Sequence, residues 1–161
     1  MQSPRLVYRK LGQTDFEPYK RWYTDEQVMQ LITGRPLTFE EVDTRFAAAL
    51  KTNRNYPDLG WYRADLPDEG FAGIVKLTPA GPFTAEVGYG LLPAFWGVGL
   101  GTEMLGALIA YASGLETLHT LTAIIHPDNL ASRKILLAQA FAITEEGVRD
   151  DGPFVAFARP I

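Results

Sequence analysis

The chain has 161 residues, of which 47% are hydrophobic and 21% charged, and its formal net charge is −4. We expect one folded domain over residues 1–161, because a single hydrophobic core serves chains of up to about 250 residues. The acidic balance disfavours nucleic acid as a partner, and the absence of cysteine excludes disulfides, thiolate metal sites and a cysteine nucleophile.

The amino-terminal residues contain no apolar run of signal-peptide length. The longest apolar stretch lies around Met104–Ser113 and is about half of the roughly 20 residues that cross a bilayer. We therefore expect a cytoplasmic protein with no membrane partner.

The first elements predicted are a strand and a helix. A β-prone run around Leu6–Tyr8 ends at Gly12 and predicts an opening strand. Thr24 and Gln27 have the spacing of a capping box, and the apolar positions that follow predict a helix that ends at Gly34.

A second helix and three strands are predicted next. Thr38 and Glu41 repeat the capping-box spacing, and an apolar stripe of helical period continues to about Thr52. Segments rich in turn formers then separate three β-prone runs that predict an antiparallel meander, over Leu59–Ala64, Phe71–Leu77 and Ala85–Leu92.

The second half of the chain alternates helices and strands before a closing hairpin. The predicted elements are a helix with its apolar face from Leu100 to Ala112, a strand over Thr117–Ile125, a helix over Asn129–Gln139, and hairpin strands over Phe141–Val148 and Phe154–Arg159. This order predicts an α/β (α+β) fold with a mixed, mostly antiparallel sheet of about seven strands and about four helices on both faces.

The most informative segment is EVGYGLLPAFWGVGLGTE, residues 86–103, where a strand leads into a glycine-rich turn and a helix. Gly97, Gly99 and Gly101 let the backbone curl and present N–H groups that, with the helix amino terminus, suit a pyrophosphate. A P-loop would need a lysine in this turn, and a dinucleotide-binding fold would need another glycine spacing early in the chain. Neither of these alternatives fits the sequence.

Two motifs carry a family resemblance. WGVGLGTE resembles the R/Q-x-x-G-x-G/A signature of the GNAT acetyltransferase superfamily, with Trp96 in place of Arg or Gln. The longer segment resembles the GY-x-L-x-P-x-x-WGKGYATEA pattern of the ribosomal-protein-alanine N-acetyltransferase branch, although Val98 replaces Lys and Gly101 replaces Ala. HPDNLASRKILLAQAF, residues 126–141, resembles that branch's P-x-N-x-x-S-x-x-[VIL]-x-x-x-x-G-F pattern, but Ala140 replaces the helix-terminating glycine.

The resemblance implies a GNAT fold with a sheet splayed between its fourth and fifth strands, and acetyl-CoA as co-substrate without a metal. Gly88 and Gly90 within the fourth strand predict a bulge or bend there. The resemblance also implies that backbone near Leu91 and Leu92 meets pantetheine and that N–H groups there stabilise the oxyanion. The cofactor-contacting residues that it implies are Leu91, Leu92, Trp96, Gly97, Val98, Gly99, Leu100, Gly101, Thr102, Asn129 and Ser132.

Glu86 and Ser132 are the candidate catalytic residues that the resemblance implies. An ammonium acceptor must lose a proton before it can attack, so Glu86 is a candidate general base, although a carboxylate at a sheet surface has the same sequence signature. Ser132 would donate to the departing sulfur and Asn129 would bond pantetheine, while an asparagine at a helix start is equally an N-cap. His126 and water remain alternative bases.

The resemblance implies transfer of an acetyl group to a primary amine of a small molecule or of a protein or peptide N-terminus, by direct attack in a ternary complex. A non-catalytic acyl-CoA-binding or sensing module is the alternative, and a homodimer is compatible with either. Acidic residues could favour a cationic amine at the acceptor site or simply form a solvated surface, namely Glu40, Glu41, Asp43, Glu145, Glu146, Asp150 and Asp151.

Overall fold

The computed structural model describes residues 1–150 and 152–161. Its strands are β1 (Val7–Lys10), β2 (Gly60–Leu66), β3 (Gly70–Gly81), β4 (Thr84–Leu91), β5 (Thr120–Ile125), β6 (Ala142–Arg149) and β7 (Gly152–Pro160). Its helices are α1 (Phe16–Tyr23), α2 (Glu26–Met29), α3 (Phe39–Asn55), α4 (Leu100–Ala112) and α5 (Leu130–Ala138), with 3-10 turns at Gln13–Asp15 and Pro93–Phe95.

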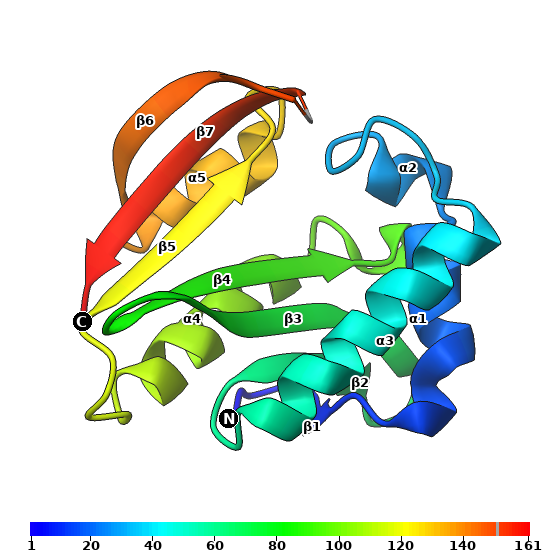
Figure 1. Ribbon diagram of the computed structural model, residues 1–161. Coiled ribbons are helices and arrows are strands. Elements are labelled where there is room, and N and C mark those ends of the chain that lie inside the picture. The colour runs from blue at the N-terminus through cyan, green and yellow to red at the C-terminus, as the bar shows by residue number, and fades with distance from the viewer. Residues whose placement is uncertain (151) are drawn as a thin grey trace.

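The described strands form one seven-stranded sheet in the order β1-β2-β3-β4-β5-β7-β6 (Figure 1). Within it, β4 and β5 pair in parallel, and the other neighbouring strands pair antiparallel. The predicted mixed, mostly antiparallel sheet is therefore confirmed.

The sheet opens between β4 and β5. These strands pair only where Thr84–Glu86 meets Thr120–Thr122, although β4 continues to Leu91 and β5 to Ile125. Figure 1 shows the two strands diverging from that short contact. The predicted splay between the fourth and fifth strands is confirmed, and Glu86 is the last residue of β4 paired with β5.

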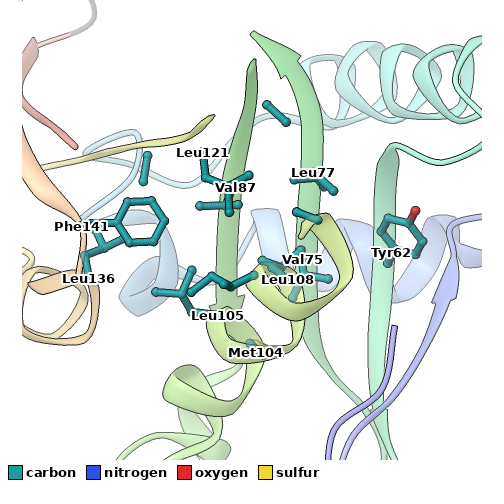
Figure 2. Close-up of a cluster of buried hydrophobic side chains, with 14 of the residues drawn as sticks. Tyr62, Val75, Leu77, Val87, Met104, Leu105, Leu108, Leu121, Leu136 and Phe141 are labelled. Atoms are coloured by element: carbon teal, nitrogen blue, oxygen red, sulfur yellow. The ribbon is translucent and has the colours of Figure 1, made fainter. Parts of the chain in front are cut away.

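Helices cover both faces of the sheet, as predicted, and each face has its own core. In Figure 2, Met104, Leu105 and Leu108 of α4 lie against side chains of β3, β4 and β5. The other face packs aromatic residues of α1 with α3, including Tyr19 and Phe46, whose ring centroids are 5.0 Å apart.

The helix that follows Thr24 is shorter than predicted, so the predicted extent was wrong. The N-cap is Asp25, whose carboxylate accepts a hydrogen bond from the Val28 N–H at 3.0 Å, and the helix ends at Met29 after one turn. The Met29 carbonyl then accepts hydrogen bonds from the N–H groups of residues 32, 33 and 34, so the chain continues in tight turns rather than as a helix.

Helix α1 was not predicted from the sequence. Pro18 lies inside this segment, but it falls in the first helical turn, where its missing N–H would have no helical partner. Burial of Tyr19, Trp22 and Tyr23 against the sheet and α3 stabilises the helix. Helix α3, by contrast, begins with the predicted capping box of Thr38 and Glu41.

The end of α5 keeps a glycine-type geometry without a glycine. Ala140 adopts a left-handed conformation with φ of 61°. Its N–H donates to the Leu137 carbonyl, and the Phe141 N–H donates to the Leu136 carbonyl, both at 3.1 Å. This is the hydrogen-bond pattern of a Schellman motif, so burial of Phe141 and Leu136 holds the alanine in a strained backbone region.

Candidate active site

Two cavities meet where β4 and β5 diverge. The first, of about 530 Å³, runs along the glycine turn and the start of α5, and we call it the glycine-turn cavity. The second, of about 420 Å³, contains Glu86, and we call it the Glu86 cavity. Both are lined by Leu31, Ile32, Tyr89, Asn129 and Ser132. A molecule in one cavity can therefore reach a molecule in the other.

The glycine turn requires the backbone freedom of glycine at two positions. Gly97 and Gly99 have φ of 77° and 84°, and Gly99 is the N-cap of α4. The first N–H groups of a helix have no partner within the helix, and the positive end of its dipole lies there. Free N–H donors therefore lie at the turn, and Gly97, Gly99 and Gly101 line the glycine-turn cavity.

Arg5 holds the turn from outside that cavity. Its Nη1 donates to the Val98 carbonyl at 3.0 Å, and its backbone N–H and Nε donate to the Glu103 carboxylate at 2.7 and 2.8 Å. Burial alone would raise the pKa of the Glu103 carboxyl, but these hydrogen bonds hold it below its usual value. Arg5 thus ties the amino-terminal segment to the turn and the first turn of α4.

Most of the predicted cofactor-contacting residues line the glycine-turn cavity. Leu92 and Val98 do not. Leu92 is buried in the core between the sheet and α1, and Val98 is 58% exposed. Those that do are Leu91, Trp96, Gly97, Gly99, Leu100, Gly101, Thr102, Asn129 and Ser132.

The backbone at the end of β4 is only partly free for a ligand. The Leu92 N–H donates to the Ala72 carbonyl at 2.8 Å, so it is not available to stabilise an oxyanion. Because alternate residues of an antiparallel strand face its partner, the Leu91 N–H then points away from β3, toward the gap. The Leu91 carbonyl accepts the Trp96 indole N–H at 2.9 Å.

Gly88 and Gly90 do not form the predicted bulge. The pairing of β4 with β3 continues without a shift from Ala85 to Leu91. Instead, both glycines make room for neighbouring side chains, since a Cβ on Gly88 would lie 2.6 Å from Lys76 Cε and a Cβ on Gly90 would overlap the Trp22 ring.

At the start of α5, Asn129 is an N-cap. Its Oδ1 accepts the Ser132 N–H at 3.1 Å, which leaves its amide nitrogen for a ligand, so the structural and the ligand-binding interpretations are compatible. Lys134 also lines the glycine-turn cavity and was not predicted. As a single lysine on an amphipathic helix, it gave no signal beyond an ordinary surface residue.

Glu86 lies beside a cation that the sequence analysis missed. The Lys76 ammonium donates to Glu86 Oε1, and the two side chains are only 25% and 27% exposed. Lys76 also lies over the Trp61 ring, with its nitrogen 5.4 Å from the centroid. The available signal was one lysine in the otherwise apolar run FAGIVKL.

Tyr89 stands between the two cavities. Burial raises the pKa of its phenol to about 12, although the Ser132 side chain acts in the opposite direction. The phenol is therefore protonated at neutral pH, and its O–H donates to the Ser132 carbonyl at 3.5 Å. His126 lines the Glu86 cavity, whereas His119 stacks on Phe83 away from it.

The described acidic residues considered for the acceptor site do not line the Glu86 cavity, which agrees with the alternative that they form a solvated surface. They are Glu40, Glu41, Asp43, Glu145, Glu146 and Asp150, and Asp151 lies outside the described residues. Arginines 45 and 149 line the cavity instead, and neither was predicted.

Within residues 1–150 and 152–161, no group of three or more His, Cys, Asp or Glu side chains is placed to hold a metal ion. The helices of these same segments are too short or too polar for any of them to cross a membrane.

A family model described as an acetyltransferase (GNAT) domain matches residues 5–141. The chain is also 33% identical, over 64 residues, to the uncharacterized N-acetyltransferase YoaA of Bacillus subtilis (strain 168). That match covers 40% of this chain and 35% of the relative, so the chain matches about a third of that protein's length.

Solved structures share the fold at low sequence identity. A ribosomal L7/L12 alpha-N-protein acetyltransferase, RimL, in complex with coenzyme A superposes with a TM-score of 0.82 at 18% identity, covering 99% of this chain and 96% of that one. A spermidine N-acetyltransferase from Vibrio cholerae in complex with CoA and spermine gives 0.81 at 14% identity, covering 97% and 95%. These similarities confirm the expected fold.

Proposed function

Because the chain belongs to the GNAT acetyltransferase family, whose activity is acetyl-CoA-dependent N-acetylation, we propose that it acetylates the primary amine of a small molecule or of a protein or peptide N-terminus. The acetyl group passes directly from acetyl-CoA to the amine while both substrates are bound. The observation that carries this proposal is the junction of the two cavities at Tyr89, Asn129 and Ser132.

The residues of the glycine-turn cavity fit acetyl-CoA. The N–H groups of Gly99, Leu100 and Gly101 bind the pyrophosphate, with Lys134 as a further cation for phosphate oxygens. The open edge of β4 beyond Glu86 offers hydrogen bonds to the extended pantetheine, as an unpaired strand edge does for another strand. The Asn129 amide adds a donor at the junction of the cavities.

Glu86 accepts the proton that the attacking amine must lose. Lys76 occupies Oε1, and Oε2 has no hydrogen-bond partner among the described residues. The Lys76 contact orients the carboxylate, and Glu86 lines the cavity in which the amine binds. Attack on the thioester then forms one C–N bond, while the carbonyl oxygen gains the charge that the Leu91 N–H stabilises.

Ser132 completes the transfer as the intermediate collapses. The C–S bond breaks and the acetyl group stays on nitrogen. The thiolate takes a proton from the Ser132 hydroxyl, the serine regains a proton from solvent, and Glu86 releases its proton to solvent. Tyr89 fixes the backbone at Ser132 through the 3.5 Å hydrogen bond to its carbonyl. Holding both substrates at one junction supplies much of the rate, because orientation replaces a bimolecular encounter.

The experiment that tests this function is coenzyme A release from acetyl-CoA with a broad panel of amines, measured against the hydrolysis background. Amine-dependent release with the wild-type protein supports transfer. Release that no amine increases would leave only acyl-CoA binding, the alternative considered from the sequence.

A further inference from the structure

Two arginines lie at the rim of the Glu86 cavity. Arg45 of α3 lines this cavity, and it forms no ion pair with any described carboxylate. Arg149, at the end of β6, lines it too, and its guanidinium lies 3.7 Å from the Phe154 ring centroid. The carboxylate paired with Arg149 is Glu145, 3.5 Å away and 63% exposed, and such exposed pairs hold a side chain weakly.

The same cavity contains a buried donor without a partner. Trp22 is 5% exposed and lines the Glu86 cavity, and its indole N–H has no hydrogen-bond partner among the described residues. A buried donor left unpaired destabilises the protein, so such groups are normally satisfied by a ligand or water.

The negative charge of the cavity is already compensated. Glu86 is the one acidic residue among the described residues that line the cavity, and Lys76 pairs with it. Arg45 and Arg149 therefore leave the cavity with excess positive charge, although the chain as a whole carries a net charge of −4. The cavity would repel a polycation and attract an anion.

We propose that the acceptor carries a carboxylate in addition to its primary amine, with the carboxylate held by Arg45 and Arg149 at the rim and the amine directed toward Glu86. A free amino acid and a peptide N-terminus followed by acidic residues share this chemistry. The inference rests on the proposed acetyl transfer, and it differs from the cationic acceptor that the sequence left open as one possibility.

Matched acceptors provide the test. Free amino acids are compared with their primary amides. Dipeptides that have an acidic second residue are compared with dipeptides that have a neutral second residue. Spermidine serves as the cationic probe. The amide group lowers the amine's own pKa, so the amides contain more free amine at neutral pH. A higher kcat/KM for the acids therefore cannot come from easier deprotonation. The two matched series separate a free amino acid from an acidic peptide as the source of the carboxylate.

The arginines are tested by the ratio of kcat/KM for the acid to that for its matched amide. We expect Arg45→Gln and Arg149→Gln each to lower this ratio by about tenfold, since hydrogen bonds to charged groups contribute that much or more. Arg54→Gln is the control, because Arg54 is an exposed arginine of the same helix that does not line the cavity, and it should leave the ratio unchanged.

Two results would overturn the inference while leaving acetyl transfer intact. One is a wild-type preference for amides or spermidine over the matched acids. The other is an acid-to-amide ratio that neither cavity variant changes relative to Arg54→Gln. If no amine of any charge increases coenzyme A release, the proposed function fails, and this inference fails with it.

Discussion

The Lys76 ammonium reaches Glu86 by passing over Gly88. Lys76 and Gly88 are directly paired residues of β3 and β4, and Glu86 is two positions along β4 on the same face of the sheet. Gly88 has no side chain, so the lysine methylenes lie close to its backbone. The orientation of the proposed base therefore depends on a residue that has no side chain.

The first prediction concerns this contact. A Cβ at position 88 would lie 2.6 Å from Lys76 Cε and 2.9 Å from Cγ, so Gly88→Ala should displace the lysine and lower kcat/KM about tenfold. Lys76→Met should have a similar effect, and the double variant should be little worse than either single one. Fully additive effects in this double-mutant cycle would show that Gly88 acts independently of Lys76.

The proposed proton-transfer residues should affect turnover and leave the fold intact. We expect Glu86→Gln to lower kcat by 10²- to 10⁴-fold, because a glutamine cannot accept the proton. Ser132→Ala should lower kcat about 10²-fold with little effect on the KM for acetyl-CoA. Steady-state rates between about pH 6 and 9 provide the test. Wild-type activity of Glu86→Gln throughout that range would transfer the role of base to His126 or water.

The glycine turn should be sensitive to any side chain at Gly99. Its φ of 84° would strain an alanine by about 1–2 kcal/mol, so Gly99→Ala should weaken acetyl-CoA binding about tenfold. Gly70→Ala is the matched control, because Gly70, the first residue of β3, has φ of 79°. Calorimetric titration should show normal affinity for that control. Equal losses of affinity would mean that strain anywhere in the fold affects the site.

The left-handed alanine at the end of α5 offers a gain in stability. Ala140→Gly should raise the free energy of unfolding by about 1 kcal/mol, because glycine adopts a φ of 61° without strain. Ala138→Gly, inside the same helix, should lower it by about 0.5–1 kcal/mol. Urea unfolding of the two variants measures both changes. A loss of stability in Ala140→Gly would contradict the strain assigned to that turn.

Asp15 should make the free energy of unfolding depend on pH in the acidic range. Its buried carboxylate accepts hydrogen bonds from Arg9, Arg63 and the Gly12 N–H, which together hold its pKa below the usual 3.8 although burial alone would raise it. A carboxyl whose pKa is lower in the folded state stabilises the fold fully at any pH above its pKa in the unfolded chain. This stabilisation is lost as the pH falls through the lower pKa of the folded state.

Asp15→Asn should therefore cost about 3 kcal/mol at neutral pH and reduce the loss of stability in acid. The measurement is urea unfolding at neutral pH and below about pH 4. The same slope of stability against pH in variant and wild type would exclude Asp15 as a source of the acid sensitivity.

The elements predicted well were those in which several local signals agreed. Helices α3 and α4 combine an apolar stripe with a capping box or a glycine N-cap, and both occur as predicted. The amino-terminal helices were mispredicted for two reasons. Asp25 rather than Thr24 caps α2, and α1 contains Pro18, a residue that is typical of helix ends and turns. In α1, tertiary burial of aromatic residues outweighs a weak local signal.

The glycine turn and the start of α5 were predictable because each is one continuous motif. The Glu86 cavity was not predictable, since Arg45, Lys76 and Arg149 come from α3, β3 and β6 and are brought together only by the folded arrangement of these elements. Each is an ordinary basic residue in the sequence. The sequence also left open whether the carboxylates near these segments line the site or form a solvated surface, because sequence distance does not tell which side chains face inward.

The measurement that tests the central claim most directly is thermal unfolding with acetyl-CoA, coenzyme A and NAD. A ligand at 100 times its dissociation constant stabilises the folded state by about 2.7 kcal/mol, or roughly 5–10 °C for a chain of this size. We predict this rise in Tm with acetyl-CoA and with coenzyme A, and none with NAD. No rise at millimolar acetyl-CoA, or an equal rise with NAD, would contradict the assignment of the glycine-turn cavity.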